Sequence, residues 1–288
     1  MKAPKISVII PAYNRGDLIE RAIRSALEQE PSPFEVIVVD DCSTDDTAHR
    51  SESTGVTVIR NPVNIGLSHT RNKAIAASTG DWIAFLDSDD FWLPGHLARL
   101  VTHSEGHVIV GDSGIGSVDG KIIGHPGPRP LRLTSPSKVI LPFNRLTPTG
   151  CMVKRTAFDQ TGGFSGRRQV EDLELWIKIL QIGTGIILPE VGFNYEQHAG
   201  QLSGNHQAMD TSLTEVVGSF KGASWWTKSI AARSSVMPIW DGIGRGKEPT
   251  STYARYRPLL NPHRLFGLLH LLTVRYRVRK RSGVRSSR

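Results

Sequence analysis

The sequence contains little cysteine and no long hydrophobic run. Its 288 residues include two cysteines, Cys42 and Cys151, which lie far apart and without the spacing of a metal site. This excludes a dense disulfide framework and favours a reducing compartment. No segment reaches the roughly 20 consecutive apolar residues that cross a bilayer. The short apolar run near the N-terminus is interrupted by Pro11, so we expect no secretory signal.

Acidic residues are absent after Glu248, so the end of the chain is strongly basic. Ten Lys or Arg residues follow that position, and because the whole chain carries a net charge of +8, residues 1–248 carry about −2. Within this tail the apolar run 265–272 is flanked by arginines, which is typical of a helix that lies in a membrane interface. Anionic head groups attract such a basic flank. We therefore expect a cytoplasmic protein associated peripherally with the inner face of a membrane.

Two other interpretations of the tail stay open. It can be a solvated segment that ends in a docked helix. Arginine runs also neutralise the phosphates of nucleic acids, but no recognised nucleic-acid module accompanies this one. Nucleic acid is therefore the least favoured partner.

Strand patterns alternate with helical patterns along the first hundred residues. Apolar runs predict strands and 3.6-residue spacing predicts helices; the strands are 6–10, 34–39, 56–59 and 82–86, and the helices are 18–27 and 69–77. This alternation predicts an α/β fold with a doubly wound, mostly parallel sheet flanked by helices. In such sheets ligands bind beyond the carboxyl ends of the strands. No GxGxxG follows the first strand, which disfavours a dinucleotide-binding domain.

The last of these strands ends in three acids within four residues, Asp87, Asp89 and Asp90. Carboxylates this close together repel one another unless a positive charge neutralises them. Their oxygens suit Mg²⁺ or Mn²⁺, which usually bind a few carboxylates together with phosphate oxygens. The strand end therefore predicts a metal site that takes a diphosphate ligand.

The acidic segment has three rival interpretations. It can be a solvated turn that caps the following helix. An EF-hand loop is excluded, because no glycine stands at the sixth position from Asp87 and Ala98 occupies the place of the closing glutamate. A phosphatase with an aspartyl nucleophile also carries acids at a strand end, but nothing else in the sequence supports covalent phosphate chemistry.

Four motifs in order carry a family resemblance; they are Ser7–Asn14, Val38–Asp45, Asn64–Ser68 with Arg71-Asn72, and Gly80–Trp82 with Leu86–Asp90. Together they resemble the family 2 glycosyltransferases, which have the GT-A fold. The resemblance is close over roughly the first hundred residues and extends more loosely to about residue 205. Four linked motifs make a chance match far less credible than one short pattern would.

The resemblance assigns nucleotide-binding and metal-binding roles at these strand ends. It implies that Tyr13, with the backbone of Pro11 and Ala12, flanks the base. Either Asp41 or its neighbour Asp40 would accept a hydrogen bond from the uracil imide or the ribose. Arg71 would bind on the base side or the diphosphate side, the alternative being an ordinary helix-surface arginine. Asp87 would lie near the ribose and the metal, and Asp89 would ligate the Mn²⁺ or Mg²⁺ that bridges the diphosphate.

The resemblance also assigns a general base. A Gly-Gly-Phe segment at 162–164 precedes a Glu-Asp pair that opens a predicted helix. By this match Asp172 is the base and Glu171 shapes its surroundings, while both acids also favour the helix N-terminus. His198 lies in a segment that resembles one closing over the diphosphate. It would be a metal ligand or a phosphate donor, unless it is merely solvated.

These expectations combine into one interpretation. Residues 1–205 form a catalytic domain with a nucleotide-binding half, 1–103, and an acceptor-side half, 104–205; residues 206–288 form a helical C-terminal region with the basic tail. The expected activity is inverting, metal-dependent transfer of a sugar from a nucleotide-diphosphate donor, a UDP-sugar, to a glycan or lipid-linked acceptor in cell-surface polysaccharide synthesis. A nucleotidyltransferase is disfavoured, because no Gly-rich basic loop follows the first strand. A degenerate glycan-binding or scaffold subunit remains the non-enzymatic alternative.

Overall fold

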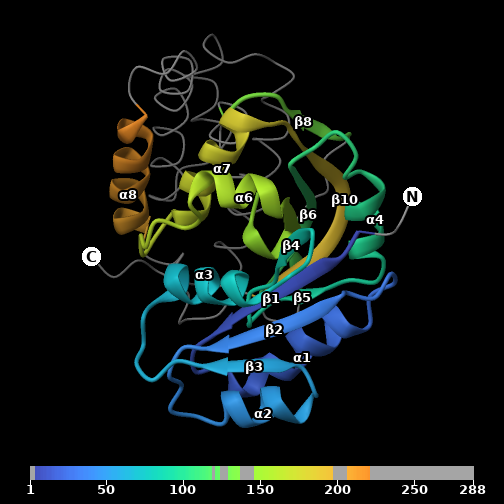
Figure 1. Cartoon of the computed structure of the whole chain (residues 1–288), viewed down its shortest axis with the longest axis vertical. Helices are drawn as coiled ribbons and strands as arrows, with labels where there is room; N and C mark the ends of the chain where they lie inside the picture. The colour runs from blue at the N-terminus through green and yellow to red at the C-terminus, as the bar shows by residue number, and fades with distance from the viewer. Residues whose placement is uncertain (1–3, 119–120, 124–128, 137–145, 197–205, 221–288) are drawn as a thin grey trace.

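The computed structural model describes residues 4–118, 121–123, 129–136, 146–196 and 206–220 (Figure 1). His198 and the basic tail lie outside these residues. The strands are β1 Ile6–Ala12, β2 Glu35–Asp40, β3 Thr57–Arg60, β4 Trp82–Phe85, β5 Phe91–Trp92, β6 Ile109–Val118, β7 Lys121–Ile123, β8 Leu131–Leu133, β9 Cys151–Lys154 and β10 Gly185–Glu196. The helices are α1 Gly16–Leu27, α2 Thr47–Ser53, α3 Leu67–Ala77, α4 His96–Thr102, α6 Arg155–Thr161, α7 Glu171–Ile182 and α8 His206–Ser219, with a 3-10 turn, η1, at Pro148–Gly150.

One ten-stranded sheet runs through the described residues in the order β3-β2-β1-β4-β9-β6-β10-β5, with β7 paired to β6 and β8 to β10. The predicted α/β fold is confirmed. β1 pairs in parallel with β2 and β4, and β2 with β3, as the buried apolar runs of the sequence predicted. Beyond β4 the sheet is mixed, because β9 runs antiparallel to both β4 and β6 while β6 and β10 are parallel.

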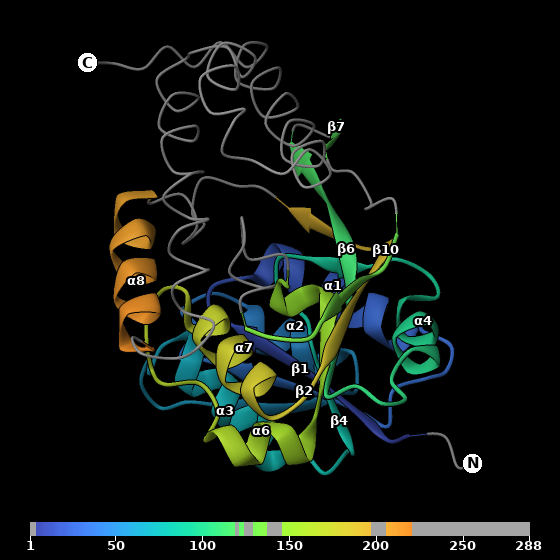
Figure 2. The same cartoon turned by 90° about the horizontal axis from the view of Figure 1, so that it is seen from above.

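Helices cover both faces of the sheet (Figure 2). On one face, side chains of α3, α6 and α7 pack in a cluster that includes Ile75, Phe158 and Trp176. On the other face, α1 and α4 contribute Ile19 and Leu97, among others. Burial of these apolar side chains on two faces is the main stabilising term for such a three-layer arrangement.

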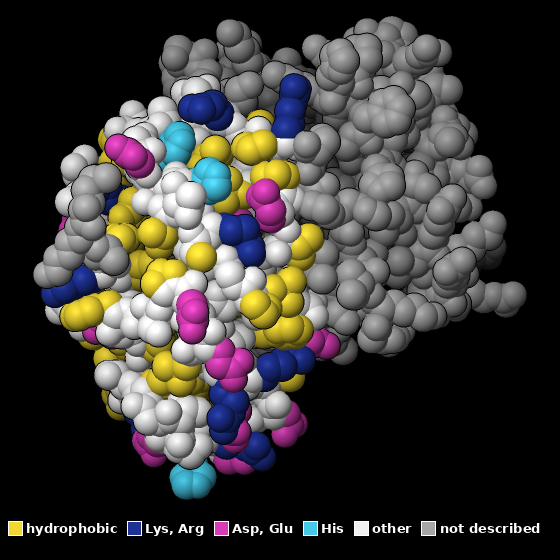
Figure 3. All heavy atoms as spheres, turned by 90° about the vertical axis from the view of Figure 1, so that its right-hand side faces the viewer, with side chains coloured by type: hydrophobic (Ala, Val, Ile, Leu, Met, Phe, Trp, Pro, Cys, Tyr) yellow, Lys and Arg dark blue, Asp and Glu magenta, His cyan; other side chains and the backbone are white. Residues whose placement is uncertain are grey.

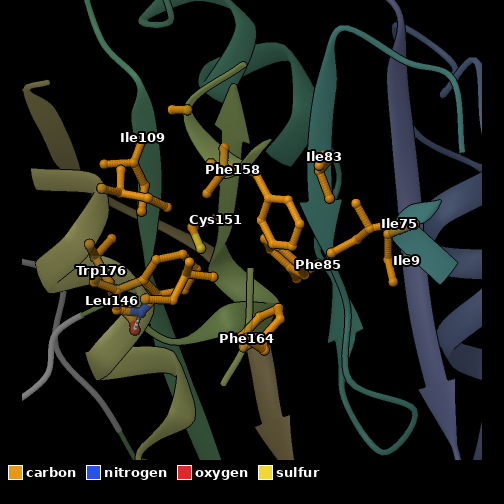
Figure 4. Packing of buried hydrophobic residues seen from close by; sticks show 14 of the residues in the cluster. Ile9, Ile75, Ile83, Phe85, Ile109, Leu146, Cys151, Phe158, Phe164 and Trp176 are labelled. Carbon is orange, nitrogen blue, oxygen red and sulfur yellow. Dashed lines mark hydrogen bonds between the residues drawn. The ribbon is translucent and has the colours of Figure 1, made fainter. Parts of the chain in front are cut away.

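Three aromatic side chains tie the start of α7 to the end of β4 (Figure 4). Phe85 is the last residue of β4, and its ring contacts Phe164 edge-on at 5.7 Å and Trp176 at 6.0 Å between centroids. Phe164 precedes α7 and Trp176 lies within it. Edge-to-face pairs of this kind add to the stability gained from burial. They hold the beginning of α7 close to the acidic strand end.

The described residues include both cysteines and can be compared with what the sequence predicted about disulfides, membrane spans and surface charge. Cys42 and Cys151 are both free, and Cys151 is fully buried, where burial raises the pKa of its thiol well above the usual value. No described helix is long and apolar enough to cross a membrane. On the face shown in Figure 3, described side chains of both charge signs are interspersed with hydrophobic ones.

Candidate active site

The carboxyl ends of β1, β2 and β4 lie side by side and bring together the predicted nucleotide-binding residues. Ala12, the last residue of β1, stands opposite Asp40 at the end of β2. Pro11 and Ala12 are buried within the strand, whereas Tyr13, just beyond it, is 44% exposed. An exposed aromatic ring over buried backbone can stack on a planar base.

The two adjacent acids after β2 have different surroundings. Asp41 Oδ1 accepts hydrogen bonds from Asn61 Nδ2 at 2.8 Å and from the backbone of Ile65 at 2.9 Å, and its Oδ2 accepts from the backbone of Gly66 at 2.8 Å. Asp41 therefore holds the loop that leads into α3. Asp40 is fully buried, and its Oδ2 accepts no hydrogen bond from the described residues, although Arg60 Nε lies 3.6 Å away. Of the two predicted acceptors, Asp40 keeps one oxygen without a hydrogen bond from the described residues, but that oxygen is buried and forms an ion pair with Arg60.

The three acids after β4 differ in how far they are buried. The side chains of Asp87 and Asp89 are 27% and 16% exposed, whereas Asp90 is 1% exposed. Burial, followed by the negative charges of Asp87 and Asp89, raises the pKa of Asp90 well above its usual value. Asp90 is therefore an internal carboxyl, and the other two are those that can meet a ligand.

Asp87 and Asp89 fit a hard divalent cation. Both offer carboxylate oxygens, the donors that Mg²⁺ and Mn²⁺ prefer. No three His, Cys, Asp or Glu side chains converge as a metal cage among the residues that the structure describes. Two carboxylates are enough for a cation that completes its coordination with water and phosphate oxygens. His198, the third predicted ligand, lies outside the described residues.

Arg15 is a site residue to which the sequence analysis gave no role. Its Nη2 lies 3.4 Å from Asp89 Oδ2, and its Nη1 donates to the backbone oxygens of Tyr13 and Asn14. The guanidinium thus brings a positive charge beside the candidate metal ligand. Its place directly after the Tyr13-Asn14 motif was the signal that could have identified it.

Arg71 joins the two halves of the site. It is 1% exposed, and its guanidinium contacts Asp87 Oδ1 at 2.5 Å and Glu171 Oε1 at 2.6 Å. Burial alone would lower the pKa of this arginine, but the charges of Asp87 and Glu171 outweigh it and raise the pKa. The ring of Phe164 lies 5.4 Å from the guanidinium and supports it by a cation–π contact. The alternative of a helix-surface arginine is therefore wrong, because α3 buries this side chain between two acids.

The loop before α7 is fastened to α3. Asn72 donates from Nδ2 to the backbone oxygen of Phe164 at 2.8 Å and accepts from the backbone N–H of Phe164 at 3.1 Å. Ser68 donates to the backbone oxygen of Arg167 at 2.6 Å. These bonds hold the glycine-containing loop against α3 and so fix where α7 begins.

The predicted Glu-Asp pair opens α7. Val170, just before it, has a φ of 53°, a left-handed conformation that β-branched residues rarely adopt and that strained functional sites often contain. Glu171 is 7% exposed and pairs with Arg71, whereas Asp172 is more exposed and accepts the backbone N–H of Leu173 at 2.7 Å. Of the pair, Asp172 is the carboxylate that can reach a substrate.

A GT-A fold with carboxylates at the end of β4 defines the class of the nucleotide-sugar glycosyltransferases. The chain belongs to glycosyl transferase family 2, since the model of that family matches residues 7–171. TuaG of Bacillus subtilis (strain 168) is 32% identical over 191 residues, covering 62% of this chain and 73% of TuaG. The first four curated relatives match over only 31–38% of their own length, so the chain spans about a third of each.

Two further comparisons bear on fold and family. The crystal structure of residues 1–349 of Staphylococcus aureus TarS in complex with UDP-GlcNAc matches with a TM-score of 0.68 and 17% identity, covering 98% of this chain and 93% of TarS 1–349. This likeness confirms the predicted GT-A fold. The succinoglycan biosynthesis protein ExoO of Rhizobium meliloti (strain 1021) is 39% identical over 126 residues, 42% of this chain and 36% of ExoO.

Proposed function

We propose that the protein is an inverting, metal-dependent glycosyltransferase that moves a sugar from a UDP-sugar to a glycan or lipid-linked acceptor in cell-surface polysaccharide synthesis. The observation that carries the proposal is the Asp87–Arg71–Glu171 bridge. It joins the acidic strand end to the start of α7, and its Arg71–Glu171 pair links residues 100 positions apart in the chain. A donor-binding edge and a general base thereby share one site.

The relatives support the choice of donor and pathway class. TarS has been crystallised with UDP-GlcNAc and with UDP. A relative from Escherichia coli is named UDP-Glc:alpha-D-GlcNAc-diphosphoundecaprenol beta-1,3-glucosyltransferase WfaP, and ExoO is named for succinoglycan biosynthesis. A UDP-sugar and a glycan or lipid-linked acceptor are the substrates that these names support by analogy.

The chain's own residues can carry out a one-step displacement, in which the acceptor oxygen replaces the nucleoside diphosphate at the anomeric carbon. The exposed ring of Tyr13 stacks on the base. Asp172 takes the proton of the acceptor hydroxyl as its oxygen bonds to the anomeric carbon. The bond from that carbon to the diphosphate oxygen breaks, and the nucleoside diphosphate leaves with the electron pair. Asp87 and Asp89 would hold a divalent cation, which would offset the charge on the leaving diphosphate.

Calorimetric titration with UDP and a panel of UDP-, GDP- and dTDP-sugars, with and without Mn²⁺, tests this proposal. We expect binding of uridine nucleotides that requires Mn²⁺, because the diphosphate and the two carboxylates would otherwise repel. Preference for a GDP- or dTDP-sugar would overturn the choice of donor. Binding to none of the panel would favour the degenerate glycan-binding or scaffold subunit.

Peripheral membrane association is proposed from the sequence alone. The apolar run 265–272 and its arginine flanks are the features that support it. Deleting the segment after Pro258 should release the protein from vesicles that contain anionic lipid, and sedimentation with such vesicles measures this. Continued sedimentation of the shortened protein would contradict the proposal, and vesicles of neutral lipid serve as the control.

A further inference from the structure

Thr149 lies beside the acidic turn, although no motif in the sequence singles it out. It is fully buried in η1, the turn directly before β9. β9 runs antiparallel to β4 with Ala84 opposite Met152, so the turn that precedes β9 lies beside the residues that follow β4. Strand pairing therefore brings Thr149 to the acidic turn from 62 residues away in the chain.

The single hydroxyl of Thr149 links the first and last acids of the turn. Its oxygen accepts a hydrogen bond from the backbone N–H of Asp87 at 3.1 Å, and its O–H donates a hydrogen bond to Asp90 Oδ2 at 2.6 Å. The other oxygen of Asp90 accepts from the backbone N–H of Glu196 at 3.0 Å. A hydroxyl can donate one bond while it accepts another, so both roles are filled at once. As a result Asp90 faces the interior, and Asp87 and Asp89 remain partly exposed.

The backbone around Thr149 is held firmly in place. η1 contacts β4, β5, β6 and β10. Trp92 Nε1 donates to the backbone oxygen of Thr149 at 2.6 Å. At Gly150 a Cβ atom would lie 2.2 Å from the ring of Phe193, so the chain packs there without room for a side chain. The hydroxyl is thus presented to the acidic turn from the rigid part of the sheet.

We infer that Thr149 is a positioning residue that fixes the turn so that Asp87 and Asp89 face a diphosphate-bound cation together. This inference rests on the proposed function. Thr149 does not touch the ligand; it acts through the backbone of Asp87 and the carboxyl of Asp90. Residues that orient metal ligands in this way typically account for about 10- to 100-fold in metal affinity.

The test is calorimetric titration of Mn²⁺ into the full chain at saturating UDP, for wild type and three variants. Thr149→Val keeps the shape but removes the hydroxyl, and we expect Mn²⁺ affinity to fall about 10- to 100-fold. Thr149→Ser keeps the hydroxyl and should retain an affinity close to wild type. Ser51→Ala, which removes a buried hydroxyl bonded to Thr47 within α2, is the matched control and should leave affinity unchanged.

The outcomes separate this inference from the proposed function. Wild-type affinity in Thr149→Val, or an equal loss in the valine and serine variants, overturns the role of the hydroxyl. A wild-type chain that binds no Mn²⁺ with UDP overturns the proposed function and this inference with it. If Thr149→Val does not fold, Thr149→Cys replaces the hydroxyl with a weakly donating thiol, and the same loss of affinity is expected.

Discussion

Replacing Asp172 with asparagine should abolish sugar transfer while donor binding stays close to wild type. Asparagine has the same shape and can still accept the backbone N–H of Leu173, so the start of α7 should keep its geometry. It cannot take the proton of the acceptor hydroxyl, and loss of a general base costs about 10²- to 10⁴-fold in rate. The measurement is turnover together with the dissociation constant for UDP-sugar.

The Asp172 prediction is specific because it expects turnover to fall while the dissociation constant for UDP-sugar stays unchanged. Asp159→Asn is the matched control, since this exposed acid lies on α6 away from the strand ends. Unchanged turnover in Asp172→Asn would remove this residue from the chemistry. Loss of donor binding along with turnover would mean that Asp172 holds the donor instead of activating the acceptor.

Replacing Asp89 with asparagine should remove the Mn²⁺ dependence of UDP binding without unfolding the protein. Asp89 is partly exposed, so the fold does not depend on its charge as it depends on the buried contacts of Asp90. We expect UDP affinity in the presence of Mn²⁺ to fall at least about 100-fold, because even partners outside the metal's own ligand set account for 10- to 100-fold. Titration calorimetry measures the affinity, and thermal unfolding checks the fold.

A variant of Arg15 serves as a comparison for Asp89→Asn, because it changes the charge beside Asp89 without removing a metal ligand. The guanidinium Nη2 of Arg15 lies 3.4 Å from Asp89 Oδ2. Arg15→Gln should lose less Mn²⁺-dependent affinity than Asp89→Asn, since it removes a neighbouring charge and no metal ligand. If Asp89→Asn retains full Mn²⁺-dependent affinity, the metal assignment is wrong whatever Arg15 does.

Local signals explain which parts of the fold and site could be predicted. The parallel half of the sheet follows from buried runs such as 6–10, because apolar β-branched residues specify a strand without reference to the rest of the chain. Asp87 and Asp89 stood out because several acids follow an apolar strand within a few residues, which is an unusual pattern. The Glu-Asp pair at 171–172 was assigned instead by its resemblance to a family segment, in which such a pair follows Gly-Gly-Phe.

The unpredicted parts depend on contacts between distant segments. Nothing near Arg71 indicates that it is buried, because its partners lie 16 and 100 residues away. Thr149 has no motif around it, and its place at the acidic turn follows from the antiparallel register of β9 on β4. The sequence also left open whether Asp40 or Asp41 is the acceptor for the nucleotide. The answer depends on which of the two carboxylates accepts the backbone N–H groups of Ile65 and Gly66, and in the structure this is Asp41.

The position of β9 limits how the protein can be divided or recombined. β9 follows residue 103, the predicted boundary between the two halves, yet it lies between β4 and β6 and pairs with β4, which precedes that boundary. A fragment ending at residue 103 would leave β4 as an open edge, a template for association with other chains. It would also leave Arg71 with one of its two acidic partners missing. A chimera that exchanges donor specificity between related enzymes would therefore have to carry β9 and the start of α7 along with the first hundred residues.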